Sequence, residues 1–474
     1  MNATADHGKL LTAASELGFR VFDMVAYRQM VEGCLDLTGR REKRRRALPA
    51  SLMVDLVVGM GLFRNLAIAG VFDELTDWMR EHRPDLPLKA VTDEAVGLGR
   101  RRLGVEPIAA LFHGLADRVE PPATFHGLRT WTIDGVNFEV PDTKPNTKAF
   151  RKVRASKGSQ TAFPQVQAVV LLASQSREVK DVILQNRYGS ERNCCAEFLE
   201  HLGPDDLGLL DRGFHAVWLF KRFIDKGAHF LCRAQTTFKP RVLRELGPGE
   251  WLVEASARVP IPKKERRRGG PKTTMIQVVL RMIQTRIPGH KSVRLLTDLT
   301  DSVLYPALEL GLFYHERWEA EIANDELKTH LAAVGGGTVR IPMRSKTPNG
   351  VIQEAYGLFV AYNLVRNLMT RAAQAANIPP QELGFTESLN VIRRSAPRFE
   401  RATYATILFL VTQLLDDLAR CRLKRSRRPR RCPRVIRIKI KHFPRKRRSH
   451  KEKPNIALTR MCLVRRLLAP AKAH

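Results

Sequence analysis

The sequence predicts an α/β protein with a helical N-terminal part, a mostly β insertion and a basic C-terminal tail. Apolar residues recur at helical spacing through the first 120 residues. From about residue 126 the pattern changes to short apolar runs separated by turn residues, and these runs then alternate with helical segments. With 474 residues, 44 % of them hydrophobic, the chain can form several cores, so a wholly disordered protein is excluded.

The N-terminal part is expected to centre on the apolar segment 51–78, whose polar residues fall on the remaining positions of a helix. Pro49 and Ser51 mark its start, as residues at helix N-termini do. Six of the seven residues 40–46 are basic. This run is either a solvated linker or a contact for phosphate groups, and the sequence does not choose between them.

After residue 126 the expected order is three strands, a helix, a strand, a helix and a strand. A tight turn at Asp134–Gly135 is expected to separate the first two strands. This order is that of a ribonuclease H-like fold. The expected elements are strands 130–133, 136–140 and 165–173, helix 191–202, strand 207–210, helix 216–226 and strand 229–233.

Residues 236–303 are rich in Pro, Gly and strand-like pieces, such as 251–255 and 273–282, so we expect a mostly β insertion with a basic hairpin tip at 263–271. Helices resume at about Tyr305 and continue through residues 352–375. The expected domains are a helical, DNA-binding N-terminal domain (1–125), a catalytic core in two parts (126–235 and 304–400), the β-rich insertion (236–303), and a C-terminal helix with a basic tail (401–474).

The charge predicts a polyanionic partner, most simply a nucleic acid. The net charge is +32, and residues 420–453 alone carry 18 Lys or Arg and one acidic residue. Basic and apolar residues alternate over 434–441, which predicts a strand with one basic face.

No membrane span is expected, because the longest apolar run, 402–415, has 14 residues and a bilayer needs roughly 20. The absence of a signal-peptide pattern and the odd count of seven cysteines indicate a cytoplasmic protein with reduced thiols.

Asp134 and Asp211 each follow an apolar run that predicts a buried strand, and each precedes a turn residue. A charge at that place is costly unless it is paired, and a metal ion is a natural partner at the mouth of a sheet. For either residue alone, a simple turn or capping role is the better interpretation. The two together favour a metal site.

Four polar residues, Tyr314, Arg317, Glu321 and Lys328, stand at offsets 0, 3, 7 and 14. At about 100° per residue they fall within an arc of about 60° on one helix face. Donors beside a carboxylate suit phosphate groups next to a metal ligand. The alternative is a solvated face with intrahelical pairs such as Arg317–Glu321. Geometry alone does not choose Glu321 over Asp325, one turn further along this face.

Together these motifs resemble the insertion-sequence-4 type of DDE transposase, a bacterial insertion-element family. Asp134-Gly, Asp211-Arg-Gly-Phe and the spacing of Tyr314, Arg317, Glu321 and Lys328 carry the resemblance, and the last is the family's signature. The resemblance covers most of the chain. Further matching segments are 48–49, 61–64, 163–165 and 344–348. Val136 is a departure, because a Thr is common there in the family; the change removes a hydroxyl but no ligand.

The resemblance implies that Asp134, Asp211 and Glu321 bind two Mg²⁺ ions about 4 Å apart, with Mn²⁺ as a possible substitute. Carboxylate oxygens suit such ions. The ions would support nicking of the element's ends and attack of the 3′-hydroxyl on target DNA, with excision through hairpin ends. The resemblance also implies a homodimer that pairs two inverted-repeat ends.

The remaining signature residues, Tyr314, Arg317 and Lys328, would hold the DNA backbone near the metals, and Tyr314 would not be a nucleophile. Trp251 is the candidate in the insertion for holding a flipped base, although a strand-core tryptophan is the more ordinary interpretation. The competing function is a catalytically inactive, transposase-derived DNA-binding protein. An intact set of three carboxylates favours the active enzyme.

Overall fold

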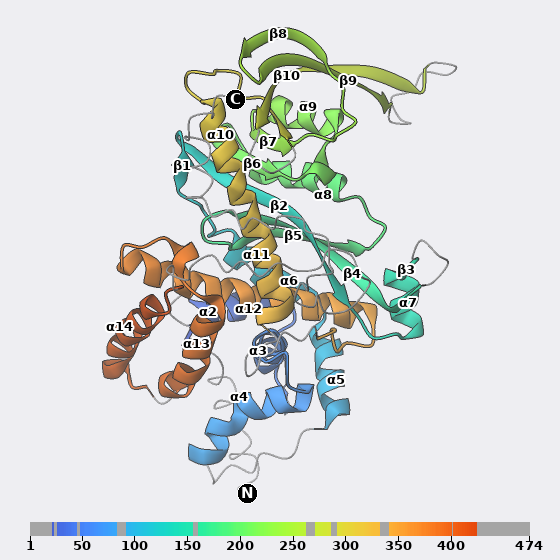
Figure 1. The fold of residues 1–474 in the computed structure, drawn as a ribbon. Helices are drawn as coiled ribbons and strands as arrows, with labels where there is room; N and C mark the ends of the chain where they lie inside the picture. The colour runs from blue at the N-terminus through green and yellow to red at the C-terminus, as the bar shows by residue number, and fades with distance from the viewer. Residues whose placement is uncertain are drawn as a thin grey trace, which may run out of the picture. The chain divides into compact units, whose positions relative to one another are not determined.

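The computed structural model describes residues 21–22, 26–44, 48–82, 92–154, 160–261, 271–285, 292–331, 341–400 and 402–423. The chain divides into two compact units. Among the described residues, the first unit comprises those within 21–123, 129–201 and 318–422, and the second comprises those within 124–128 and 202–317 together with residue 423. Both units contain helices and strands, so the mixed α/β class expected from the sequence is confirmed (Figure 1).

The sheet of the first unit is built around the long strand β4. β4 pairs antiparallel with β2, with the short strand β3 and with β5 (Figure 1). Every second residue of β4 from Val166 to Leu172 is buried in the core of this unit, as the period of a strand requires. The strands are β2 (Leu128–Glu139), β3 (Lys152–Arg154), β4 (Gln160–Ala173) and β5 (Val179–Asn186).

Helices supply the rest of the first unit. They are α2 (Tyr27–Leu37), α3 (Ala50–Leu62), α4 (Ile68–His82), α5 (Asp93–Leu103), α6 (Glu106–Ala116), α7 (Lys144–Phe150), α8 (Glu191–Glu197), α11 (Trp318–Asp325), α12 (Pro348–Ala375), α13 (Phe385–Glu400) and α14 (Tyr404–Arg420). A 3₁₀ turn, Phe198–His201, extends α8, so the helix expected over 191–202 changes geometry near its end.

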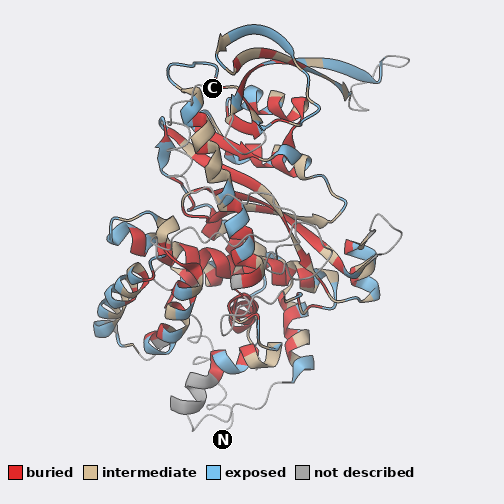
Figure 2. Cartoon of the chain, viewed as in Figure 1, coloured by how far each residue is buried: buried red, intermediate tan, exposed pale blue. Residues whose placement is uncertain are grey.

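Helices α3 and α12 form the centre of this core, and all residues of α3 are buried (Figure 2). They cross at two glycines. A Cβ on Gly61 would lie 2.8 Å from Ala361 Cβ, and a Cβ on Gly357 would lie 2.5 Å from the carbonyl oxygen of Val57. No larger side chain fits at this crossing without moving the helices apart.

The expectation of two strands joined by a turn at Asp134–Gly135 is wrong. β2 runs through both residues, which pair with Val170 and Val169 of β4 without a break. Gly135 serves a close approach instead of a turn, because a Cβ there would lie 2.5 Å from Glu191 Oε1. The third antiparallel strand of the unit is β5, which the sequence pattern did not reveal.

The apolar segment 51–78 is not one helix, because α3 ends at Leu62 and α4 begins at Ile68. Arg344 donates hydrogen bonds to the carbonyl oxygens of Met60, Phe63 and Leu66. These bonds satisfy acceptors that the end of a helix leaves without partners. Arg344, which is far away in sequence, therefore stabilises the interruption between α3 and α4. The sequence of the segment itself does not predict this interruption.

The second unit contains a sheet in the order β6-β7-β11-β10-β9-β8. β6 and β7 are parallel and the other neighbours are antiparallel. The expected strands at 251–255 and 273–282 are confirmed. The elements are β1 (Ala123–Phe125), β6 (Asp206–Leu210), α9 (Val217–Lys226), β7 (His229–Arg233), β8 (Arg241–Gly247), β9 (Glu250–Pro260), β10 (Thr273–Thr285), β11 (Val293–Thr297) and α10 (Ala307–Phe313).

A buried arginine connects this sheet to the segment that leads into α10. Arg281 donates to Glu250 Oε1 at 2.7 Å and to the carbonyl oxygen of Tyr305 at 2.7 Å. Its side chain is fully buried. A buried guanidinium needs several acceptors, and here they come from β9 and from the residues before α10.

No helix of the described residues is both long and apolar enough to cross a membrane.

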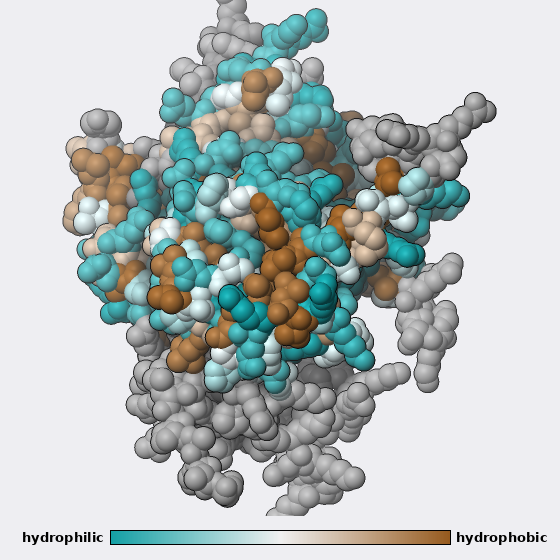
Figure 3. All heavy atoms as spheres, turned by 90° about the horizontal axis from the view of Figure 1, so that it is seen from above, coloured by the Kyte–Doolittle hydropathy of each residue, from teal (hydrophilic) through white to brown (hydrophobic). Residues whose placement is uncertain are grey.

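The face seen in Figure 3 is mostly hydrophilic, with separate hydrophobic areas. Exposed apolar side chains of the second unit include Val242, Leu243, Met275 and Val279. The hairpin tip expected at 263–271, apart from its last residue, and nearly all of the basic tail, with its expected strand at 434–441, lie outside the described residues.

Candidate active site

Asp134 lies within β2, in the first unit, and its carboxylate has two hydrogen-bond donors. Oδ2 accepts a hydrogen bond from Asn324 Nδ2 at 2.8 Å, and Oδ1 accepts one from the amide of Gly135, also at 2.8 Å. An ionised carboxylate only accepts hydrogen bonds, so both contacts fit its charged form. The contact with Asn324 joins the middle of the sheet to the helix that carries Glu321.

The helical run that carries the signature residues changes geometry along its length. Tyr314–Arg317 is a 3₁₀ helix, α11 follows over Trp318–Asp325, and Glu326–His330 forms a π-helix. The expected regular face with 100° per residue therefore applies only to α11. Within α11, Glu321 is three residues before Asn324 and lies on the same face, exposed to solvent.

Buried ion pairs hold α11 in place within the first unit. Arg177, in the turn between β4 and β5, donates to Glu319 Oε2 at 2.5 Å and to Glu326 Oε1 at 3.0 Å. Arg366 of α12 donates to Glu326 Oε2, and Tyr362 donates to the same oxygen at 2.9 Å. We call these five residues the α11 clamp. The position of Glu321 relative to β2 depends on it.

Asp211 lies in the second unit, directly after β6, whose five residues are all buried. The expectation that it ends a buried strand is confirmed. Its Oδ1 accepts a hydrogen bond from the amide of Gly213 at 2.5 Å, so it also caps the short 3₁₀ helix Arg212–Phe214.

Asp211 also lines an open cavity of about 430 Å³, together with Gln235 and Thr236. The carboxyl ends of parallel strands meet at one edge of a sheet, which places the segments after β6 and β7 side by side. The carboxylate is therefore accessible to a ligand from solvent.

Tyr314 contacts the end of the same strand. Its hydroxyl donates to the carbonyl oxygen of Leu210 at 2.9 Å, one residue before Asp211. Burial raises the pKa of the Tyr314 phenol, so the group keeps its proton. A neutral phenol in a hydrogen bond is a poor nucleophile, and its contact holds the backbone that presents Asp211.

No group of three or more His, Cys, Asp or Glu side chains close enough to hold a metal ion is found among the residues that the structure describes. Asp134 and Glu321 belong to the first unit and Asp211 to the second. All three supply carboxylate oxygens, which are the donors that Mg²⁺ and Mn²⁺ prefer. The donor chemistry therefore fits a hard divalent cation.

Two protein families match this chain. A family described as "Transposase DDE domain" matches residues 127–364, half of the chain. A family described as "Insertion element 4 transposase N-terminal" matches residues 18–113. The chain belongs to the insertion-sequence-4 family of DDE transposases.

Two Escherichia coli proteins of similar sequence agree with this assignment. The transposase is 28 % identical over 422 residues to the transposase InsG for insertion sequence element IS4 of Escherichia coli K12, covering 88 % of this chain and 91 % of that protein. It is 25 % identical over 225 residues to the putative transposase InsZ of the same organism, covering 46 % and 72 %. The cryo-EM structure of the piggyBac transposase synaptic complex with hairpin DNA aligns with a TM-score of 0.40 and 12 % identity, covering 86 % of this chain and 84 % of that one.

The other predicted site residues of the transposase lie in both units. Tyr314 and Arg317 belong to the second unit and Lys328 to the first. Lys328 lies in the π-helix after α11 and lines a cavity with Arg187. Trp251 lies in β9, half-buried, between Glu245 of β8 and Met282 of β10. Their roles toward DNA stay predictions.

Sequence reasoning missed Asn324 and the α11 clamp. Asn324 is 8 % exposed and was visible only as one polar residue three positions after Glu321. That spacing is the signal that could have found it, because residues three apart share a helix face. Arg177 and Arg366 have no such signal, since their partners are far away in sequence.

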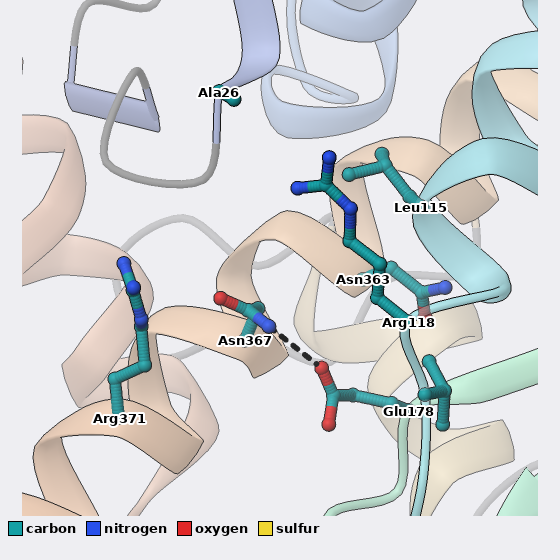
Figure 4. A pocket seen from close by; sticks show the side chains of 8 residues that line it. Ala26, Leu115, Arg118, Glu178, Asn363, Asn367 and Arg371 are labelled. Carbon is teal, nitrogen blue, oxygen red and sulfur yellow. Dashed lines mark hydrogen bonds between the residues drawn. The ribbon is translucent and has the colours of Figure 1, made fainter. Parts of the chain in front are cut away.

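A further cavity of the transposase, of about 240 Å³, lies in the first unit and contains none of the predicted site residues (Figure 4). Asn367 donates to Glu178 at 3.2 Å, and the side chains of Arg118 and Arg371 also line this cavity. Burial raises the pKa of Glu178. The hydrogen bond from Asn367 to Glu178 joins α12 to the turn between β4 and β5.

Proposed function

We propose that this transposase is an active enzyme that cuts DNA at the inverted-repeat ends of its element and transfers the ends to target DNA. The observation that carries the proposal is the hydrogen bond between Asn324 and Asp134, because it turns the signature helix toward the strand of the first aspartate. Membership in a DDE family supports the same activity.

The proposed fold of the catalytic core is ribonuclease H-like, in two parts interrupted by the β-rich insertion at 236–303. Support comes from three antiparallel strands, β2, β4 and β5, followed along the chain by α8, β6, α9 and the parallel strand β7. The proposed domains are 1–125, which binds DNA, then 126–235, 236–303, 304–400 and 401–474.

In this proposal Asp134, Asp211 and Glu321 hold two divalent cations, Mg²⁺ or Mn²⁺. When bound, such ions stabilise the charge on the attacking and leaving oxygens of a phosphoryl transfer. Geometry favours Glu321 over Asp325, because on α11 it lies about 60° from the direction of Asn324, whereas Asp325 lies about 100° away. Asp325 already accepts a hydrogen bond from Thr329 at 2.9 Å.

The remaining residues would act on DNA. Arg317 and Lys328 would donate to the backbone of the transposon end, and Tyr314 would hold the end of β6 in addition to any contact with DNA. Trp251 would contact a base. Because two ends must be paired, the proposed assembly is a homodimer on DNA.

The purified protein is expected to nick a supercoiled plasmid that carries its gene with the flanking DNA, and to need Mg²⁺ or Mn²⁺ for this. Chelation with EDTA should stop the reaction, because the carboxylates then lack their cation. Conversion of supercoiled to nicked and linear plasmid, with the cuts mapped by sequencing, measures the effect. A plasmid without the flanking DNA is the control.

A clear bandshift on the same DNA without any metal-dependent cut would favour the inactive DNA-binding protein. Cuts scattered over both plasmids would contradict recognition of specific ends.

Truncation after Leu423 is expected to make DNA binding less dependent on salt, because it removes most of the basic tail. Each phosphate contact adds about 0.9 to the slope of log K against log salt concentration. The slope is measured by fluorescence anisotropy with a short duplex. A variant whose tail is replaced by an uncharged Gly/Ser segment of equal length should match the truncation. An unchanged slope would show that the tail does not contact phosphates.

A further inference from the structure

A basic cavity of about 310 Å³ lies in the first unit, next to the signature helix. It is lined by residues from β2, from β4, from the turn after β5 and from the π-helix that follows α11. The residues of its lining that bear on a ligand are Arg64, Asn137, Glu139, Arg187 and Lys328.

The cavity has an excess of positive charge. Arg64, Arg187 and Lys328 line it together with a single carboxylate, that of Glu139. Arg64 is buried and donates to the carbonyl oxygens of Leu327 and Ile341, so it stabilises the wall. Arg187, in contrast, has no hydrogen bond or ion pair with the residues that the structure describes. Its guanidinium can take an anionic ligand.

A second observation also points to a ligand. The Oδ1 atom of Asn137 is buried and has no hydrogen-bond partner among the described residues. An unsatisfied buried amide oxygen costs free energy. A ligand with its hydration water would supply the missing donor, as bridging waters commonly do at protein–DNA interfaces.

The distance from the carboxylates suits DNA. At about 3.3 Å per residue, Asn137 is about 10 Å along β2 from Asp134, and because the two are three residues apart in an unbroken strand, their side chains are on opposite faces of the sheet. At about 1.5 Å per residue, Lys328 is about 10 Å along the helical run from Glu321. Both elements lead away from the carboxylates to this one cavity. The rise of about 3.4 Å per nucleotide is measured along the duplex axis, and successive phosphates of one strand lie further apart than this, so 10 Å corresponds to about one or two nucleotides.

We infer that Arg187, beside Lys328, binds the phosphodiester backbone of the transposon-end strand about one or two nucleotides from the reacting phosphate. The inference rests on the proposed function and adds a DNA contact outside the signature motif. Arg187 donates to non-bridging phosphate oxygens through a planar guanidinium, which can make two parallel hydrogen bonds.

The test combines protein variants with DNA in which single phosphates are neutralised as methylphosphonates. The probe is a duplex with the inverted-repeat sequence that flanks the reading frame. For the wild type, neutralising the phosphate about one or two nucleotides from the cut should weaken binding about tenfold, the loss of one charged hydrogen-bond contact. In Arg187→Ala the intact duplex should bind about tenfold more weakly, and the same methylphosphonate should cause no further loss.

Two further variants make the result decisive. Arg398→Ala removes the same charge from the exposed end of α13 and should keep the full methylphosphonate effect. Arg187→Lys keeps the charge and should retain part of the methylphosphonate effect. If Arg187→Ala remains as sensitive as the wild type at every phosphate, or if neither the first nor the second phosphate from the cut has any effect on the wild type when neutralised, the inference is wrong. Failure of the proposed function would show differently, as a wild-type protein that does not cut the unmodified duplex in Mg²⁺.

Discussion

Alanine in place of Asp134, Asp211 or Glu321 is expected to lower DNA cleavage by about a thousandfold or more, while binding of the transposon end stays close to that of the wild type. Loss of one carboxylate ligand removes several kcal/mol of transition-state stabilisation, and each 1.36 kcal/mol is a factor of ten in rate. The phosphate contacts that provide most of the affinity remain. Single-turnover cleavage of a labelled end in Mg²⁺, with a bandshift in parallel, measures both quantities.

Asp325→Asn is the matched control, because Asp325 follows Asn324 on α11 and accepts a hydrogen bond from Thr329 of the same helical run. Its cleavage rate should stay within a few-fold of the wild type. If Asp325→Asn abolishes cleavage and Glu321→Gln does not, the helix face has been assigned wrongly. Full cleavage by any of the three alanine variants would refute the proposed carboxylate set.

Glu326→Gln is expected to destabilise the first unit by about 3–5 kcal/mol, the cost of breaking a buried ion pair by removing one partner. Glu326 is 3 % exposed and is the shared acceptor for Arg177, Tyr362 and Arg366. Without its charge, the buried guanidinium of Arg366 loses its carboxylate partner, and that of Arg177 keeps its pair with Glu319 alone among the described residues. Urea unfolding, followed by circular dichroism, measures the shift in the free energy of unfolding.

Glu382→Gln is the comparison for this variant, because Glu382 pairs at 3.3 Å with Arg422, whose side chain is 54 % exposed. A pair of this kind contributes about 0–1 kcal/mol. Equal losses for the two variants would mean that the α11 clamp contributes no more than a surface pair, and the argument that it positions Glu321 would fail.

Elements that are determined by their own local pattern of apolar residues were predicted well. β6, α9 and β7 lie where the apolar runs and helical spacing put them, and β9 and β10 are the expected strands of the insertion. The prediction of a turn at Asp134–Gly135 was wrong. The glycine allows the side chain of Glu191 to lie close to the backbone of β2, and this contact joins segments that are far apart in sequence. The break after α3 was missed for a similar reason, since Arg344 stabilises it from another part of the chain.

For the candidate site, residue spacing was sufficient to select Asp134, Asp211 and Glu321 as candidates, but it does not show what supports them. Asn324 and Tyr314 act through contacts, with Asp134 and with Leu210, that only a fold can bring about. Arg187 lies in no motif at all. It lies beside Lys328 because the residues just after β5 and the π-helix after α11 line the same cavity.

Three acidic residues within eight positions of one another, at 319, 321 and 326, have different roles in the transposase. Two belong to the α11 clamp, and the third is the proposed metal ligand. Glu319 and Glu326 have buried arginine partners, whereas Glu321 is exposed. Substitutions at the first two should behave as temperature-sensitive alleles, with transposition recovering when cells are grown cooler, because a folding deficit shrinks as the working temperature moves away from the unfolding transition. A substitution at Glu321 should be inactive at every growth temperature. Cooling therefore separates the residues that shape the helix from the one that serves the reaction.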